Sequence, residues 1–208
     1  MTSFALVATV DAATASEFRS QLRTPPFGLP QAGILGHQVF VGPEHAAFVF
    51  WGSDPEGALV RASGHADVRR RVSDAIEGLR MPRRLDPVFE WAAPGHEVDA
   101  DGRSVAVVVR GVESRPDPGA GRMAALVDRL GAGLKRARVF TGEGVALLVF
   151  ERDDETPDTR TRISLATLRD EAPVVPLRPL EVLDQTYWFE VRDRLPPRPS
   201  RGILKEDA

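Results

Sequence analysis

The sequence repeats part of itself at an offset of 100 positions. The segment "HQVFVGPEHAAFVFWGSD", from His37 to Asp54, aligns without a gap with "ARVFTGEGVALLVFERDD", from Ala137 to Asp154. The shared letters are valine, phenylalanine, glycine, alanine and aspartate, in the same order. Internal repetition constrains a fold strongly, because each copy must adopt the same supersecondary unit. The chain is therefore expected to contain two copies of one unit.

Further matches at this offset predict the division of the chain. "VFEW" at 88–91 lies over "WFEV" at 188–191, which aligns Glu90 with Glu190, and "ALVATV" near the start lies close to "VAVVVRGV". We expect a first repeat over 1–95, a junction over 96–103, a second repeat over 104–193, and a flexible proline-rich tail over 194–208.

The spacing of apolar residues and the positions of glycine and proline predict the order strand, helix, strand, strand, helix, strand in each repeat. In the first repeat these elements are a strand at 4–10, a helix capped by Asp11, two strands around a Gly42-Pro43 turn, a helix over 58–79, and a strand after Pro87. In the second repeat they are 105–112, 123–134, 137–141, 145–151, 161–171 and 186–191. The prolines at 173, 176 and 179 rule out a continuous helix before the last strand.

This element order builds a four-stranded antiparallel sheet with both helices on one face. The strand segments "AAFVFW" and "VALLVF" are apolar with little alternation, so both faces of each sheet should be buried. The expected fold is therefore α+β, with tandem ferredoxin-like repeats whose two sheets pack into an intramolecular barrel. In this arrangement the chain resembles the dimeric α+β barrel superfamily in an internally duplicated form.

The resemblance implies a range of functions. Proteins of this superfamily include cofactor-free monooxygenases, polyketide cyclases, lactone isomerases, haem-degrading oxygenases, chlorite dismutases and stress-response proteins, and their ligands usually lie between one sheet and its helices. Fold alone does not choose among them. We therefore expect either a non-catalytic or small-molecule-binding barrel protein, or a cofactor-independent monooxygenase, cyclase or isomerase acting on a hydrophobic or aromatic molecule.

Composition excludes several classes of protein. The chain has no cysteine, which removes disulfides, thiolate metal sites and cysteine nucleophiles. Its net charge of -3 gives no general attraction to nucleic acid or to anionic membranes, and its apolar runs are strand-sized. The alternative of an RNA-binding module is disfavoured, because "HAAFVFW" and "VALLVFE" lack that module's basic-glycine and aromatic pattern. We expect a cytoplasmic protein with no nucleic-acid or membrane partner.

All four histidines lie in the first repeat or the junction. His37 and His45 flank the predicted hairpin and could approach each other across it, so either is a candidate general base. The alternative is that both are solvated or capping residues. His65 and His96 are expected to flank a helix and to lie in a loop, respectively.

Glu90 is the third catalytic candidate, because a carboxylate among aromatic residues can serve as an acid or base. Its recurrence as Glu190 favours the alternative, in which it faces solvent or an arginine. Asp11, Arg19 and Trp51 are candidate ligand-binding residues of the first repeat.

No cofactor is expected. No histidine pair has the helical i, i+4 spacing of a zinc site, and the acidic clusters do not fit a calcium loop. Haem is disfavoured, because relatives resembling chlorite dismutase carry the proximal histidine in their second unit, where this chain has none. We expect a monomer with an internal pseudo-dimer, or a homodimer.

Overall fold

The computed structural model describes residues 2–21, 33–64, 80–94, 103–111, 125, 127–128, 134–152 and 177–190. The strands are β1 (Thr2–Thr9), β2 (Ile34–Val41), β3 (His45–Gly52), β4 (Arg80–Ala92), β5 (Arg103–Gly111), β6 (Leu134–Gly142), β7 (Val145–Arg152) and β8 (Leu177–Glu190). The helices are α1 (Ala12–Gln21) and α3 (Pro55–Ser63).

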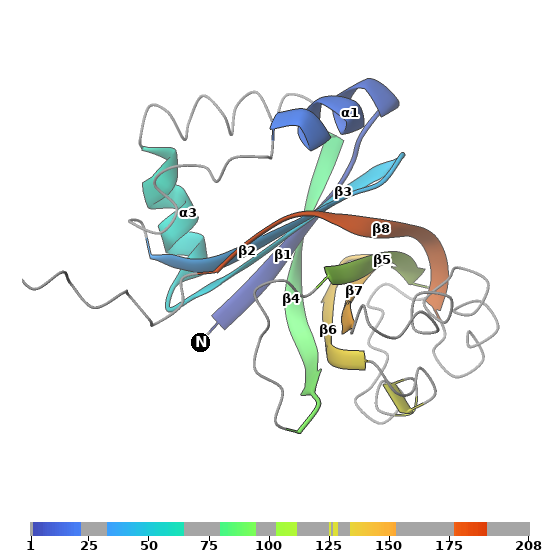
Figure 1. The fold of residues 1–208 in the computed structure, drawn as a ribbon. Coiled ribbons are helices and arrows are strands. Elements are labelled where there is room, and N and C mark those ends of the chain that lie inside the picture. Colours follow the sequence, from blue (N-terminus) through green and yellow to red (C-terminus); the bar gives the residue numbers. More distant parts are fainter. Residues whose placement is uncertain are drawn as a thin grey trace, which may run out of the picture.

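The strands form one closed antiparallel barrel in the order β1-β3-β2-β8-β5-β7-β6-β4 (Figure 1). Around the ring, β4-β1-β3-β2 is followed by β8-β5-β7-β6, so the N-terminal and C-terminal strands follow the same order. The last strand of each half also pairs with the other half, β8 with β2 and β4 with β6. The two halves therefore share both seams of the barrel. These features agree with the expected α+β barrel.

Strand alternation separates two apolar cores. Side chains facing the barrel interior come from both halves and include Ala5, Val7, Phe40, Val49, Leu85, Ala106, Phe140, Leu147 and Leu183. The outer face of the N-terminal strands carries a second core with Phe4, Val39, Phe48 and Phe50, which packs against Ala15 of α1 and Ala58 of α3. The strands β2 and β3 are thus buried on both faces, as their unbroken apolar runs predict.

The helices α1 and α3 each begin after a capping aspartate. The backbone N–H of Thr14 donates to Asp11 Oδ1 over 2.8 Å, which confirms the predicted cap of α1. The N–H of Gly57 donates to Asp54 Oδ1 over 3.0 Å. The second helix begins at Pro55 rather than at the predicted residue 58. Proline is favoured in the first helical turn because its missing N–H would have no partner there.

The last strand of each half is longer than predicted. We expected strands after Pro87 and at 186–191, whereas β4 begins at Arg80 and β8 at Leu177. Their prolines fall at irregularities of pairing: Pro87 beside a register shift against β6, and Pro179 beside one against β5. A bulge lets a strand continue through a residue that cannot donate a backbone hydrogen bond.

Other boundary predictions have mixed outcomes. Leu134 begins β6 and does not end the predicted helix over 123–134. Several predicted segments lie wholly or largely outside the described residues. They are the helix over 123–134, residues 65–79 of the helix predicted in the first repeat, the helix over 161–171, most of the junction, and the tail.

Backbone register corrects one alignment made from the sequence. Gln38 pairs with Trp188, and Arg138, at the matching position of β6, pairs with Glu90. The counterpart of Glu90 is therefore Trp188 and not Glu190. The last strands correspond at an offset of 98, because fewer residues separate β7 from β8 than separate β3 from β4 along the chain.

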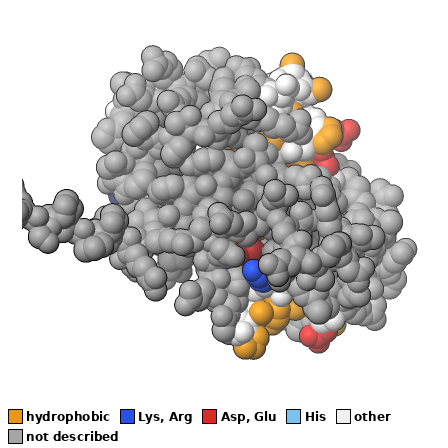
Figure 2. Space-filling model, in the orientation of Figure 1, with side chains coloured by type: hydrophobic (Ala, Val, Ile, Leu, Met, Phe, Trp, Pro, Cys, Tyr) orange, Lys and Arg blue, Asp and Glu red, His pale blue; other side chains and the backbone are white. Residues whose placement is uncertain are grey.

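The described surface carries side chains of both charges beside apolar ones (Figure 2). No helix within the described ranges is both long enough and apolar enough to cross a membrane.

Candidate functional site

A row of stacked side chains crosses the outer face of the first-half sheet, with one residue from each strand. The row consists of Arg84 on β4, Phe4 on β1, Phe50 on β3 and His37 on β2. The Arg84 guanidinium carbon lies 6.0 Å from the Phe4 ring centroid, and the Phe4 and Phe50 centroids are 5.2 Å apart. The His37 and Phe50 rings are nearly parallel, at 7° with a 4.4 Å centroid separation. We call these four residues the aromatic row.

The three rings of the row are all buried, with Phe4 4% and Phe50 5% exposed. His37 is 5% exposed and also stacks near Phe48, with ring centroids 6.4 Å apart. Burial lowers its pKa from 6.5 to about 3, because a charged imidazolium loses its hydration there. At neutral pH His37 is therefore a neutral imidazole within an apolar core.

Within the part of the chain that the structure describes, the C-terminal half has no equivalent row. At an offset of 100, the counterparts of His37 and Phe50 are Ala137 and Phe150. Register places Val105 and Val182 at the positions of Phe4 and Arg84. Three of the four row residues are thus aliphatic in the second half, and among the described residues the stack occurs in the first half.

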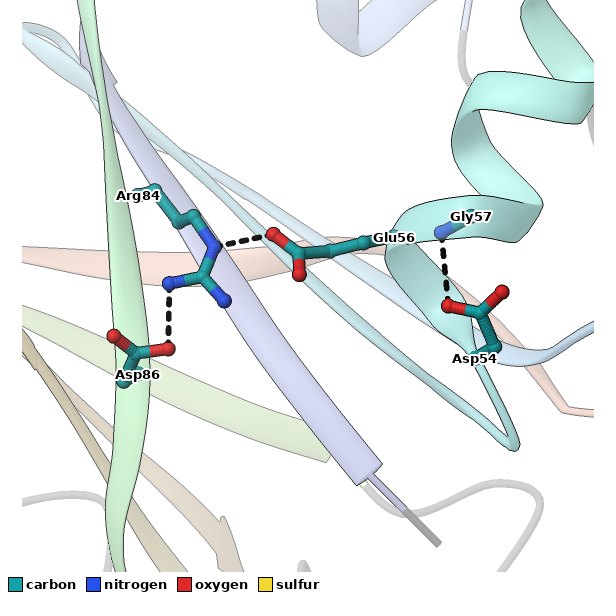
Figure 3. Close-up of polar contacts among 5 residues, drawn as sticks. All are labelled: Asp54, Glu56, Gly57, Arg84 and Asp86. Atoms are coloured by element: carbon teal, nitrogen blue, oxygen red, sulfur yellow. Dashed lines mark hydrogen bonds and ion pairs between the residues drawn. The ribbon is translucent and has the colours of Figure 1, made fainter.

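Arg84 occupies the solvent end of the row. Its side chain is 47% exposed and joins two carboxylates, Glu56 in the first turn of α3 and Asp86 on its own strand (Figure 3). The Nη1 atom donates to Asp86 Oδ1 over 2.6 Å, and Nε donates to Glu56 Oε1. The hydrogen bond to Glu56 contributes most to raising the pKa of Arg84. The ion pair also links α3, which covers the outer face, to β4.

The structure does not bring His37 and His45 together. His37 stacks on the outer face, whereas His45 has the same strand parity as Ala47 and Val49, which face the barrel interior. His45 begins β3 and pairs with Thr9 of β1, whereas His37 of β2 pairs with Phe50 near the other end of β3. The predicted approach across the hairpin is therefore wrong, because side chains of opposite strand parity point to opposite faces.

His45 instead contacts Glu181 of the other half. Its Nδ1 lies 2.7 Å from Glu181 Oε2, and the N–H of Glu44 donates to Oε1 over 3.2 Å. Gly42 makes this possible, because a Cβ there would lie 2.1 Å from Oε1. Glu181 thus holds the β2–β3 turn against β8.

An arginine performs the same task at the other seam. Arg83, the positional counterpart of Glu181, donates from Nη1 to the carbonyl oxygen of Glu143 in the β6–β7 turn over 2.9 Å. This correspondence supports a structural role for the His45–Glu181 pair. We call the two contacts the hairpin clamps.

The other predicted site residues are dispersed. Glu90 is exposed and forms an ion pair with Arg136 across β4 and β6, which is the structural alternative stated for it. Asp11 caps α1. The side chain of Arg19 lies outside the described residues.

Trp51 lies inside the barrel in a buried polar cluster. Its ring lies 5.3 Å from the guanidinium carbon of Arg138, which donates to Gln38 Oε1. Gln38 in turn donates to Ser104 Oγ over 3.1 Å. This cluster joins both halves on the interior face of the barrel. Because His37 lies on the outer face, the sheet separates it from Trp51.

Sequence reasoning missed Phe4 and Arg84. Both lie on strands whose pairing partners are set by register, and the sequence carried no signal for a contact between residues 80 positions apart. Among the described residues, no group of three or more histidine and acidic side chains could hold a metal ion.

Solved structures share this fold. The sequence matches no protein-family model and no curated protein sequence. A candidate monooxygenase from Fusobacterium nucleatum is 10% identical with a TM-score of 0.52, covering 91% of this chain and 94% of its own. A candidate monooxygenase from Lactobacillus acidophilus is 10% identical with a TM-score of 0.50, covering 92% and 97% respectively. At this identity the likeness establishes a common fold only.

Proposed function

We propose that this protein binds an aromatic small molecule on the outer face of its first-half sheet. The observation that carries the proposal is the aromatic row, in which a neutral imidazole and two phenylalanine rings stack side by side beneath the helices. Aromatic side chains gain about 0.5–1.5 kcal/mol per well-placed ring pair beyond area burial, so a planar ligand that enters between the sheet and the helices would gain from these rings, which are themselves only 4–5% exposed. The corresponding positions of the second half carry aliphatic residues at three places out of four and offer no such stack.

A second candidate function is cofactor-independent oxygenation of such a ligand. The observation that favours it is the fold shared with two candidate monooxygenases. The buried His37 imidazole is neutral, but its pKa of about 3 makes it a weak proton acceptor. The lowered pKa of His37 means that the imidazolium forms only if the ligand anion produced in the same step stabilises it. The ligand must therefore carry an acidic hydrogen close to the imidazole.

We also infer that the two halves arose as copies of one unit. Three matching pairs of irregularities support this origin. Register shifts occur at corresponding places in β2–β3 and β6–β7, in β4–β6 and β2–β8, and in β1–β4 and β5–β8. Bulges are retained within families as built features of a sheet. In such a duplicate one copy can keep a site while the other becomes scaffold.

Binding is tested with a matched pair of variants. Phe50→Leu disrupts the row, whereas Phe150→Leu makes the same change at the corresponding buried position of the second half. We expect 2-naphthol, at a hundred times its dissociation constant, to stabilise the wild type and F150L by about 2.7 kcal/mol, and F50L by much less. Thermal unfolding with and without the ligand measures this. Equal losses in both variants would contradict the proposed site.

The enzymatic candidate is tested by oxygen consumption with 1,4-dihydroxynaphthalene, corrected for its spontaneous oxidation. His37→Phe keeps a stacked ring and removes the nitrogen atoms that accept a proton. We expect this variant to retain binding and lose any protein-dependent oxygen uptake. Uptake that persists in His37→Phe would exclude His37 as the base.

A further inference from the structure

We propose that the ligand of the aromatic row carries an anionic group, and that Arg84 binds this group in place of Glu56. The inference rests on the proposed function and specifies its ligand as an aromatic acid. Arg84 is the specificity-determining residue at the open end of the row, opposite the buried His37.

The geometry of Arg84 provides the first argument. Its guanidinium lies over the buried Phe4 ring and is itself 47% exposed, so an acidic group on a ligand bound at this edge of the row falls within its reach. Guanidinium and carboxylate groups match as charge-assisted hydrogen-bond partners, which are roughly twice as strong as neutral ones. Glu56 already makes this contact, and a ligand carboxylate would have the same chemistry.

The exposure of the ion pair provides the second argument. The side chains of Arg84 and Glu56 are 47% and 54% exposed. Exposed ion pairs contribute little to stability, because water and salt screen them. Glu56 can therefore turn to solvent at small cost while the ligand takes its place. Asp86, which is on the same strand as Arg84, keeps the guanidinium oriented during the exchange.

Arg83 supplies a matched control within the same strand. It follows the interior parity of Leu85 and serves the hairpin clamp, whereas Arg84 faces outward over Phe4. Replacing either arginine with glutamine changes the net charge equally. Only Arg84→Gln removes the charge at the row.

The experiment compares 2-naphthoate with neutral 2-naphthol by isothermal titration at pH 7. We expect the wild type to prefer 2-naphthoate, Arg84→Gln to weaken 2-naphthoate binding about tenfold, and Arg83→Gln to leave that preference unchanged. Binding of 2-naphthol should change little in either variant. Glu56→Gln should tighten 2-naphthoate binding several-fold, because the competing carboxylate is gone, and a folding defect cannot produce that gain.

The outcomes separate the two proposals. If the wild type binds 2-naphthol at the row but shows no Arg84-dependent preference for 2-naphthoate, the ligand class proposed here is wrong and the aromatic site remains. Equal losses in Arg84→Gln and Arg83→Gln, or an unchanged affinity in Glu56→Gln, also overturn it. If neither compound binds, the proposed function fails together with this inference.

Discussion

His37 illustrates how one buried side chain couples ligand chemistry to stability. Its native pKa is about 3, against 6.5 for an ordinary histidine. Above pH 6.5 both the native and the unfolded protein carry a neutral imidazole, so this residue adds no pH dependence. Between 6.5 and about 3 only the unfolded chain takes up the proton, and stability therefore falls as the pH falls.

We predict that His37→Phe removes this acid sensitivity. The native state then no longer contains an imidazole that resists protonation, while the stacked ring is kept. Relative to the wild type, the variant should gain up to about 1.4 kcal/mol of unfolding free energy for each pH unit below 6. Urea unfolding at pH 7, 5.5 and 4.5 measures the difference. A difference that stays constant over this range would contradict the buried, neutral state of His37.

Asp11, a candidate ligand-binding residue, caps the N-terminus of α1. Its carboxylate accepts the Thr14 N–H at the start of α1. We predict that Asp11→Ala costs about 1 kcal/mol of unfolding free energy, whereas Asp11→Asn, which can also cap, stays close to the wild type. Chemical unfolding gives both values. If Asp11→Asn abolishes 2-naphthol binding without loss of stability, Asp11 belongs to the site after all.

Within the β2–β3 hairpin, Gly36 leaves room for the Trp51 ring. A Cβ at Gly36 would lie 1.8 Å from an indole carbon of its cross-strand neighbour. We predict that Gly36→Ala costs about 1–3 kcal/mol, and that it costs far less in a Trp51→Leu background, because the collision disappears. A double-mutant cycle measured by urea unfolding provides the coupling energy. Additive costs would show that the two residues act separately.

The sequence was sufficient to predict where several strands lie along the chain. It was insufficient to predict on which face of the sheet their side chains lie. The repeated hairpin letters correctly located β2, β3, β6 and β7, since apolar runs and glycine turns are local signals. The long β4 and β8 were missed because Pro87 and Pro179 sit at pairing irregularities that only a partner strand reveals. His37 and His45 were paired wrongly because strand register, which sets their faces, depends on contacts distant in the chain.

At the scale of the whole molecule, the interior core contains side chains from both halves. Leu85 and Leu183 occupy corresponding interior positions, and both are fully buried. We predict that Leu85→Ala and Leu183→Ala each cost about 2–5 kcal/mol and shift one common unfolding transition. Val60→Ala, on an exposed helix position, should change little. Calorimetry tests this, and two separate transitions would show that the halves unfold independently.

The pairing of each last strand with the other half has a consequence for biosynthesis. When the ribosome has completed β4, the free edges of β4 and β2 have no partners, because these are β6 and β8. Almost 100 further residues are needed to finish β8, which takes roughly 5–20 s at ordinary translation rates. Throughout that interval the nascent sheet exposes the apolar face that later lines the barrel. The barrel is therefore most vulnerable to aggregation while it is being made, and early chaperone contact should matter more for its yield than the stability of the finished protein.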